Sequence, residues 1–288
     1  MFKNLIKKIK LLLILGRYNY PIGSLLLMWP CLWGMAYRID SLEVFIKYSF
    51  LFILGSFVMR GAGCCINDII DKDLDILIKR TKDRPLASGK IDLLDAIFFT
   101  IFQLLIGLII LFQFNLKIIF FGIFIMPLVI TYPLFKRVTF FPQIVLGIVF
   151  NWGVILGLLV ENEDLSFGGI MLYLAGVIFT ITYDTIYGMQ DIKDDKKVGV
   201  KSLAILIEKR FMFYIGCFYL LTFIFFFISL KLVSTNNFSL LSYSLILISV
   251  FLFQIIFLWK KKEYKKNFDM NIISGGLIFL VFLLQNYF

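Results

Sequence analysis

Long apolar segments separated by short polar ones run through the whole chain. An α-helix needs about 20 apolar residues to cross the hydrocarbon core of a bilayer, with roughly 17 to 25 as the usual range. The pattern therefore predicts an all-α, polytopic membrane protein. We expect about nine spans, at residues 21–37, 44–66, 96–114, 118–132, 141–160, 170–187, 211–230, 240–259 and 272–285. Residues 1–20 precede them as an amphipathic segment, and residues 1–288 are predicted to form one domain.

Composition and charge support this interpretation. The chain is 60% hydrophobic and 17% charged, whereas average proteins contain roughly 25% charged residues. Cytoplasmic loops collect Lys and Arg, and with a cytoplasmic N-terminus 24 of the 29 basic residues fall on that side and three on the other. This split predicts a cytoplasmic N-terminus and a C-terminus on the opposite side of the membrane. As a separate expectation, we place the chain in the inner membrane of a bacterium. The net charge of +10 then reflects topology and attraction to anionic lipid rather than nucleic acid binding.

The chain contains no histidine. This excludes Ser-His-Asp and Cys-His catalysis and metal sites built on imidazole. The four cysteines, Cys31, Cys64, Cys65 and Cys217, match neither a metal-binding spacing nor a disulfide framework, and we interpret them as small apolar packing residues. Any chemistry must therefore use carboxylates, Lys, Arg, amides, hydroxyls or a recruited metal.

Eight of the 19 acidic residues lie in two short segments, and the first follows the second predicted span. If that helix continues at 3.6 residues per turn, Asp68, Asp71 and Asp75 share one face. Asn67 lies beside this stripe and Asp73 lies off it. Carboxylates stacked on one helix face repel one another, so the stripe needs a compensating cation.

The second acidic segment follows the sixth predicted span and has the same phase. A continuing helix aligns Asp184, Asp191 and Asp195, with Asp194 about a quarter-turn away. Both stripes lie at predicted cytoplasmic helix ends. A solvated, acid-rich helix end would explain one cluster by itself. Two clusters in matching phase favour a binding site, because hard oxygen ligands suit magnesium, which usually binds one or two carboxylates together with substrate phosphates.

Basic residues accompany both stripes. Arg80 and Arg84 follow the first stripe in a turn-rich loop, Lys201 follows the second, and Lys136 with Arg137 follows the fourth predicted span. The excess of bases in cytoplasmic loops would explain any one of these groups. Their pairing with the acidic stripes favours contact with phosphate oxygens, above all for Lys136 and Arg137.

Arg60 lies inside the second predicted span, where a charge costs about 2.5 to 3.5 kcal/mol on insertion scales. It precedes Asp71 by 11 residues and therefore points to nearly the same side of the helix. A salt bridge to an Asp would explain it, and so would a guanidinium that holds a substrate anion.

These residues resemble the motifs of the UbiA superfamily of intramembrane aromatic prenyltransferases, and most closely its branch that acts on 4-hydroxybenzoate. The similarity runs from about residue 17 to 205, and the last third matches mainly in hydropathy. The first family motif, N-D-x-x-D-x-x-x-D, is matched by Asn67, Asp68, Asp71 and Asp75, and the second, D-x-x-x-D, by Asp191 and Asp195, which follow Tyr183-Asp184-Thr185. Matching context includes residues 21–30, 59–64, 80–81, 84–89, 132–133, 136–137 and 142–143.

The resemblance implies helices bundled around a central cavity, magnesium dependence, and transfer of a polyprenyl group from polyprenyl diphosphate to carbon 3 of 4-hydroxybenzoate in ubiquinone biosynthesis. Magnesium would neutralise the leaving diphosphate, and aromatic, apolar helices would keep water from an allylic cation. We expect metal binding by Asp68, Asp71, Asp75, Asp184, Asp191 and Asp195, catalysis by Asp71, Asp75, Asp191, Asp195 and Arg137, and substrate binding by Arg60, Asn67, Asp68, Arg80, Arg84, Lys136, Tyr183, Asp184, Tyr187 and Lys201.

Several alternatives stay open. The acceptor carboxylate or the diphosphate would be held by Arg60 or by Arg137. The alternative acceptors are another phenol, naphthoate, homogentisate or haem, as in sister families, and an ion or small-anion transporter also places acids along its pathway. One departure concerns Asn19 and Tyr20, because relatives commonly carry an Asp and a basic residue there. Prenyl chain length and oligomeric state are encoded by no motif.

Overall fold

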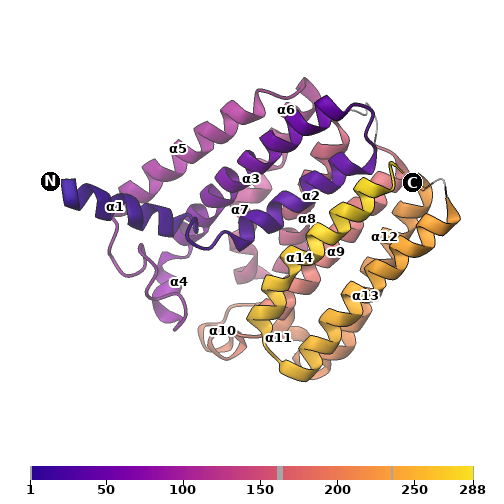
Figure 1. The fold of residues 1–288 in the computed structure, drawn as a ribbon. Helices are drawn as coiled ribbons and strands as arrows, with labels where there is room; N and C mark the ends of the chain where they lie inside the picture. The colour runs from indigo at the N-terminus through magenta and orange to yellow at the C-terminus, as the bar shows by residue number, and fades with distance from the viewer. Residues whose placement is uncertain (1, 161–164, 235, 288) are drawn as a thin grey trace.

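The computed structural model describes residues 2–160, 165–234 and 236–287, which fold into a bundle of helices (Figure 1). Within these residues, seven helical segments are long and apolar enough to cross a membrane. Two further apolar helices, α2 (Ile22–Tyr37) and α8 (Pro142–Leu158), are shorter. The chain is therefore an all-α, multi-pass membrane protein, and these segments together are compatible with the nine expected spans.

The remaining helices follow along the chain with short connections between them. The first half contains α1 (Phe2–Leu15), α3 (Leu42–Ile70), α4 (Lys72–Leu77), α5 (Leu93–Leu111), α6 (Leu116–Phe124) and α7 (Met126–Val138). The second half contains α9 (Phe167–Gly188), α10 (Ile192–Val198), α11 (Leu203–Ile207), the 3₁₀ turn η1 (Glu208–Arg210), α12 (Phe211–Val233), α13 (Asn237–Lys261) and α14 (Tyr264–Leu284).

The core is built around α9, which packs against α8, α12 and α14. A second close contact joins α2 to α8, where glycines let the two backbones meet. A side chain at Gly34 would collide with the carbonyl of Val154, and one at Gly157 would lie 2.8 Å from the backbone nitrogen of Met35. Helices in lipid associate through such small residues because apolar burial alone does not drive them together.

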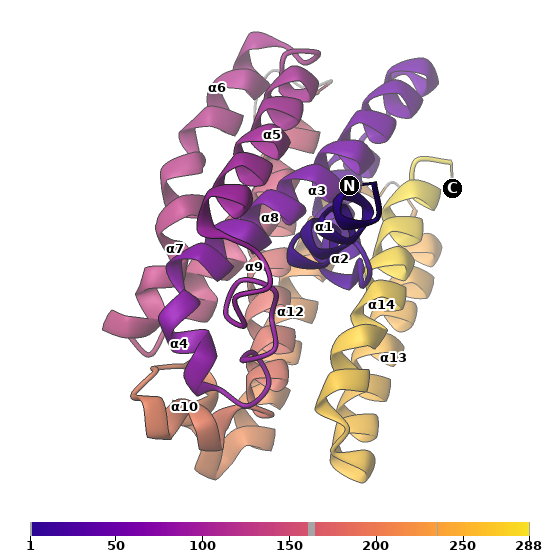
Figure 2. The same cartoon turned by 90° about the vertical axis from the view of Figure 1, so that its left-hand side faces the viewer.

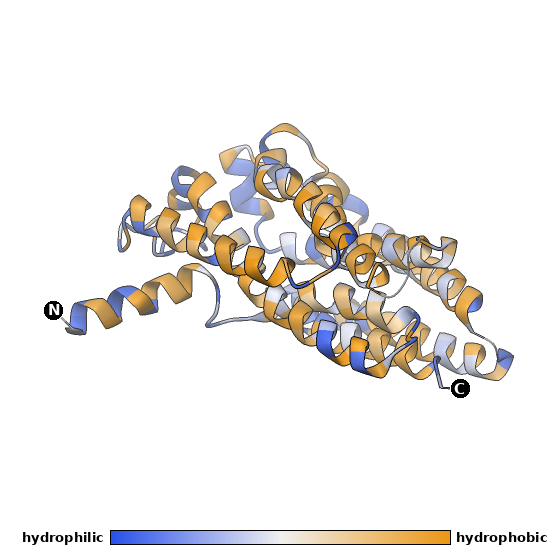
Figure 3. Ribbon diagram, turned by 90° about the horizontal axis from the view of Figure 1, so that it is seen from above, coloured by the Kyte–Doolittle hydropathy of each residue, from blue (hydrophilic) through white to orange (hydrophobic). Residues whose placement is uncertain are grey.

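The outer surface of the bundle is apolar. Large side chains such as Leu105, Ile109, Phe253 and Trp259 are exposed on it, and Figure 3 shows hydrophobic residues along the helices with hydrophilic ones gathered in loops and at helix ends. In water such a surface would drive aggregation. In a bilayer it faces the acyl chains, and the helices satisfy their own backbone hydrogen bonds.

Both acidic segments lie at one end of the bundle. Figures 1 and 2 show α4 and α10 there, and α1 crosses the direction of the long helices at the same end. We call it the aspartate end. Lys8 ties α1 to Asp95 at the start of α5 with a 2.7 Å ion pair, and Leu15 is buried against Cys65 and Ala96. The C-terminus lies at the opposite end (Figure 1).

Two spans differ from the expected boundaries for clear reasons. The fourth span breaks at Ile125 between α6 and α7, because Pro127 lacks the N–H that a continuous helix would use. The ninth, α14, begins at Tyr264 rather than at residue 272. Hydropathy hides this first part because it is polar, but Asn267 and Asn271 are buried and donate to the carbonyls of Gln254 and of α14 itself.

Candidate active site

Both aspartate motifs interrupt their helices in the same way. Asp71 separates α3 from α4, with φ −96° and ψ 6°. Asp191 follows the end of α9 and precedes α10, with φ −101° and ψ −4°. The expected continuous helices are therefore wrong, because each motif is a long helix followed by a short one. This backbone conformation is sparsely populated and recurs at active sites, and it gives the two motifs the same local shape.

Asp68 lies between two guanidinium groups and is 2% exposed. Arg17 Nη2 donates to its two oxygens at 2.9 and 2.8 Å, and Arg84 Nη1 donates to Oδ1 at 2.9 Å. The same Arg84 nitrogen donates to Asp75 Oδ2 at 2.7 Å. Burial raises the pKa of Asp75, and the Arg84 charge opposes that rise. Arg84 thus joins the first and last carboxylates of the motif.

Asp71 is fully buried and faces different bases. Lys136 Nζ pairs with its Oδ2, and Arg137 Nη2 lies 3.4 Å from its Oδ1. Arg137 also donates to the carbonyl of Ile70 at 2.8 Å. Asp73 is exposed to solvent, which places it apart from the other three acids as the stripe geometry predicted.

Arg80 connects the two motifs. It follows the first motif in the chain, yet its Nε and Nη2 lie 3.0 and 2.7 Å from the two oxygens of Asp191 in the second. Its Nη1 also donates to the hydroxyl of Tyr187 at 3.2 Å. A bidentate pair of this kind is geometrically specific, so the loop after the first motif is fixed against the second.

Asp195 and Asp184 are the acids of the second motif that no such pair neutralises in the described residues. Burial raises the pKa of Asp195 to about 6, the charge of Asp191 adds to the rise, and Arg80 and Lys136 lower it. Asp184 is hydrogen-bonded to Gln143. Lys136 thus forms an ion pair with Asp71 of the first motif, and its positive charge also lowers the pKa of Asp195 in the second. One lysine therefore links the charges of the two motifs.

A polar cavity of about 260 Å³ lies among these groups. Seven of the residues expected from the sequence line it, namely Arg60, Asn67, Asp68, Arg80, Arg84, Asp184 and Tyr187. Polar and charged walls of this size suit a small anionic ligand. The other expected acids, Asp71, Asp75, Asp191 and Asp195, do not line this cavity. Asp71, Asp75 and Asp191 contact bases that line or flank it.

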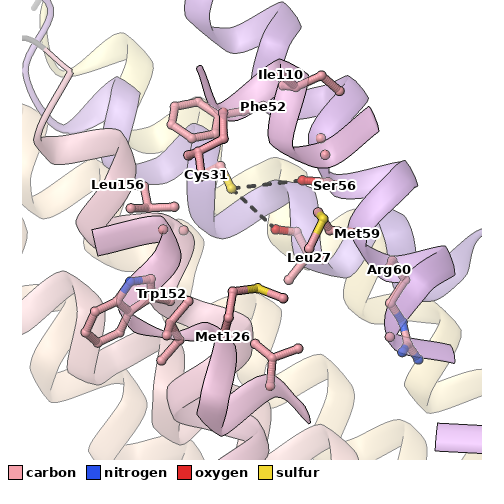
Figure 4. A pocket seen from close by; sticks show the side chains of 18 of the residues that line it. Leu27, Cys31, Phe52, Ser56, Met59, Arg60, Ile110, Met126, Trp152 and Leu156 are labelled. Carbon is pink, nitrogen blue, oxygen red and sulfur yellow. Dashed lines mark hydrogen bonds between the residues drawn. The ribbon is translucent and has the colours of Figure 1, made fainter. Parts of the chain in front are cut away.

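A larger, apolar cavity of about 450 Å³ adjoins the polar one. Arg60 and Tyr132 line both, so the two cavities meet there. Figure 4 shows Arg60 at one end of the apolar cavity and Phe52 with Ile110 toward the other. Along its side, Leu105 and Ile123 line the cavity and are also exposed on the surface of the bundle. The cavity is thus open toward lipid.

Arg60 forms no ion pair within the part of the chain that the structure describes. Its Nε is buried without a hydrogen-bond partner among the described residues, and its guanidinium lies 5.3 Å from the centre of the Phe150 ring. Gly23 leaves room for it, because any side chain there would collide with the guanidinium. The charge of Asp184 acts on Arg60 although the two form no ion pair among the described residues, so the guanidinium keeps hydrogen-bonding capacity for a further anion.

Besides Lys136, two expected substrate-binding residues do not line the polar cavity. Lys201 donates to the carbonyl of Val138 at 3.0 Å and lies over the Phe140 ring, so it fastens the loop after α7 rather than lining the polar cavity. Tyr183 is buried and accepts a 3.1 Å hydrogen bond from Thr180. In this structure the Lys201 side chain therefore holds a neighbouring loop, and the Tyr183 side chain packs in the core of the bundle.

The carboxylates fit magnesium through their donor chemistry rather than through a preformed cage. In residues 2–160, 165–234 and 236–287, no group of three acidic or cysteine side chains is arranged to hold a metal ion. Magnesium, however, usually takes one or two carboxylates and completes its shell with water and substrate phosphates. The acids and the polar cavity provide the first part of that shell, and a diphosphate would provide the rest.

Eight residues that line the polar cavity were not among the expected site residues, and Arg17, Tyr20 and Phe268 are three of them. Arg17 precedes the first span, Tyr20 takes the place of the family's usual residue, and Phe268 belongs to α14. Arg17 is a non-glycine residue with φ 62°, a conformation that costs about 1 kcal/mol or more. The motifs gave no signal for Phe268, because it lies in the last third of the chain, where the sequence resembles the family mainly in hydropathy.

Comparison with known proteins agrees with this geometry. The model of the UbiA prenyltransferase family matches residues 27–282. The mitochondrial 4-hydroxybenzoate polyprenyltransferase of Drosophila pseudoobscura pseudoobscura is 49% identical over 193 residues, which cover 66% of this chain and 49% of that protein. The 4-hydroxybenzoate octaprenyltransferase of Blochmanniella floridana is 40% identical over 223 residues, 77% of each chain. The chain matches about half the length of its mitochondrial relatives.

Solved structures share the fold. A UbiA homolog from Aeropyrum pernix K1, solved in the apo form, has a TM-score of 0.73 and 22% identity over 92% of this chain and 98% of its own. A UbiA homolog from Archaeoglobus fulgidus, bound to GPP and Mg²⁺, has a TM-score of 0.72 and 18% identity over 96% and 98% of the two chains. At these identities the likeness shows the fold alone.

Proposed function

The chain belongs to the UbiA prenyltransferase family, and on that premise we propose that it transfers a polyprenyl group from polyprenyl diphosphate to carbon 3 of 4-hydroxybenzoate in ubiquinone biosynthesis. One observation carries the proposal. A polar cavity lined by carboxylates and guanidinium groups meets a larger apolar cavity at Arg60 and Tyr132. The diphosphate fits the first cavity and the prenyl chain fits the second, so the reacting carbon lies at their junction.

The bases and acids of the aspartate end would hold the diphosphate. Arg80 and Arg84 line the polar cavity and would donate charge-assisted hydrogen bonds to phosphate oxygens. Lys136 and Arg137 lie behind it at Asp71. Magnesium, when bound, would supply the positive charge that stabilises the leaving diphosphate. Its ligands would be Asp71, Asp75, Asp191 and Asp195, with Asn67, Asp68 and Asp184 in support.

Arg60 is the residue that we assign to the acceptor carboxylate. Arg137 is already engaged by Asp71 and by the carbonyl of Ile70, whereas Arg60 lines both cavities with its Nε unpartnered among the described residues. A carboxylate bound there would place the phenol ring of 4-hydroxybenzoate in the polar cavity, next to the junction. A guanidinium recognises a carboxylate with two parallel hydrogen bonds, which also orients the ring.

The reaction needs a dry junction. The allylic C–O bond of the donor breaks, the electron pair leaves with the diphosphate, carbon 3 of the phenol bonds the allylic carbon, and the proton of carbon 3 is released. The apolar cavity excludes water from the cation, and the faces of Phe150 and Tyr132 at the junction favour positive charge. The rest of a long prenyl chain leaves through the lipid-facing side beside Leu105 and Ile123.

We also propose that the aspartate end faces the cytoplasm of a bacterial inner membrane. The support is the excess of basic residues in the loops at this end, since such loops are retained on the cytoplasmic side. Both substrates then meet at the cytoplasmic surface, where the water-soluble acceptor enters the polar cavity and the donor arrives from the bilayer.

The direct test is transfer by the purified chain. In detergent or liposomes with magnesium, a polyprenyl diphosphate and 4-hydroxybenzoate, we expect 3-polyprenyl-4-hydroxybenzoate and free diphosphate, measured by mass spectrometry. A panel of naphthoate, homogentisate and haem tests the acceptor. Absence of product with every acceptor would contradict the proposed activity, and transport of ions by the reconstituted chain without transfer would point to a transporter.

A further inference from the structure

Residues 16–21, which we call the strap, connect α1 to α2 across the aspartate end. Three strap side chains reach three different helices. Arg17 pairs with Asp68 on α3, Tyr18 donates to Gln103 Oε1 on α5 at 2.7 Å, and Tyr20 donates to Asp269 Oδ1 on α14 at 2.7 Å. The strap is therefore fixed along its length, and it holds Arg17 in its unfavourable backbone conformation.

Tyr20 and Tyr18 make similar hydrogen bonds but lie in different places. Tyr20 lines the polar cavity, whereas Tyr18 packs against Gly16 and Gly61 outside it. The hydroxyl of Tyr20 is held by Asp269, and Lys265 Nζ lies 5.0 Å from the centre of its ring. These two contacts with α14 fix the position of the ring at the mouth of the cavity.

Two more aromatic rings stand on the same cavity wall. Phe268, adjacent to Asp269, lines the cavity, and so does Tyr187, whose ring centre is 4.5 Å from that of Phe268. Arg60 stands at the inner end, where the polar cavity meets the apolar one. A cavity with a guanidinium at one end and aromatic rings along its wall suits a flat aromatic acid, because rings pack on rings and guanidinium binds carboxylate.

We propose that Tyr20 is a specificity-determining residue that packs against the ring of the aromatic acceptor, and that its hydrogen bond to Asp269 fixes it in this position. The inference rests on the proposed function and adds a residue from the strap and a partner from α14 to its acceptor site. It also assigns α14 a part in acceptor binding although that helix carries none of the motif residues.

The test compares acceptor kinetics in four variants. Tyr20→Phe and Asp269→Ala each break the same hydrogen bond and are expected to raise the KM for the acceptor about fivefold, within the range set by the net contribution of a typical hydrogen bond, with the KM for the donor and kcat near wild type. The double variant should be no worse than either single one, because both remove one contact. Tyr18→Phe is the matched control, since it breaks an equal bond of the strap outside the cavity, and its acceptor KM should stay at the wild-type value.

Tyr20→Ala tests whether the ring of Tyr20 itself contacts the acceptor or only helps to hold the strap in place. Removing the ring enlarges the mouth of the cavity, so bulkier aromatic acids should gain rate relative to 4-hydroxybenzoate. An unchanged acceptor KM in Tyr20→Phe and Tyr20→Ala would overturn the inference, and so would an equal increase in Tyr18→Phe, which would show that the strap acts only through general stability. A wild-type chain that prenylates no acceptor contradicts the proposed function instead, and the two failures are thus distinct.

Discussion

Single carboxylates at the aspartate end differ sharply in surroundings although they are close in sequence. Asp71 is buried against Lys136 and Arg137, and Asp73, two residues later, is exposed. Of the two, only Asp71 contacts the bases beside the cavity. Substitutions at Asp71 and Asp73 therefore test whether activity depends on the position of each carboxylate in the proposed site.

We expect Asp71→Asn to lower kcat about 100-fold or more, because it removes a charge on which the bases and the metal both depend. The same change at Asp191 should have a similar effect. Asp73→Asn is the matched control, and its kcat should stay within about twofold of wild type because surface changes rarely matter. Steady-state turnover at saturating magnesium measures all three, and equal losses at Asp71 and Asp73 would refute the arrangement.

Arg60 is expected to act on acceptor binding. It lines the polar cavity and forms no ion pair among the described residues, although the charge of Asp184 acts on it. In Arg60→Met the KM for 4-hydroxybenzoate should rise about 10- to 100-fold, as expected for a lost charged hydrogen bond. Phenolic acceptors without a carboxylate should be insensitive to the change. A variant that is less stable and equally active would assign Arg60 to structure.

The sequence could predict which residues carry charge at the site but only part of their geometry. Residue spacing placed Asn67, Asp68 and Asp184 at one cavity with Arg80 and Arg84, because local periodicity and charge are visible in the chain. It could not predict that Tyr20 meets Asp269, since that contact joins residues 249 positions apart and depends on how α14 packs.

The helices, too, could be predicted from the sequence only in part. Hydropathy located the apolar helices, because a bilayer imposes their length. It did not show that Asp71 and Asp191 each separate a long helix from a short one, since no Pro or Gly marks the break at Asp71 and the break before Asp191 is marked only by Gly188, the last residue of α9. Hydrogen bonds and ion pairs to bases from other elements hold these turns, and such partners are known only from the tertiary structure.

The contact between α2 and α8 predicts a selective response to added methyl groups. Gly157→Ala should lower the stability of the folded bundle by about 1 to 3 kcal/mol, because a new Cβ would push against the backbone of α2. Gly216→Ala on α12 is the control, since nothing lies within 4 Å of its added Cβ, and helix propensity should leave stability equal or slightly higher. Denaturant titration in detergent measures both variants, and equal destabilisation would show that the α2–α8 contact tolerates a methyl group.

At the scale of the whole molecule, four of the six aspartates in the two motifs are paired with bases of the chain itself. Arg17, Arg80, Arg84, Lys136 and Arg137 pair with Asp68, Asp71, Asp75 and Asp191. Magnesium alone would compete with these bases for the carboxylates, and diphosphate alone would compete with the carboxylates for the bases. Bound together, the metal and the diphosphate satisfy both sets of groups, so each should favour the other.

We therefore expect positive linkage between magnesium and a non-hydrolysable polyprenyl diphosphate analogue. Either ligand alone should raise the unfolding temperature little, and both together should raise it clearly, because stabilisation follows the affinity for the folded state. Calorimetric titration should show that magnesium tightens binding of the analogue by the same factor by which the analogue tightens binding of magnesium. Arg84→Gln frees Asp68 and Asp75 from a competing base and should strengthen binding of magnesium alone while weakening that of the analogue. If magnesium and the analogue bind independently to the wild-type chain, the idea that each ligand releases charged groups for the other is contradicted.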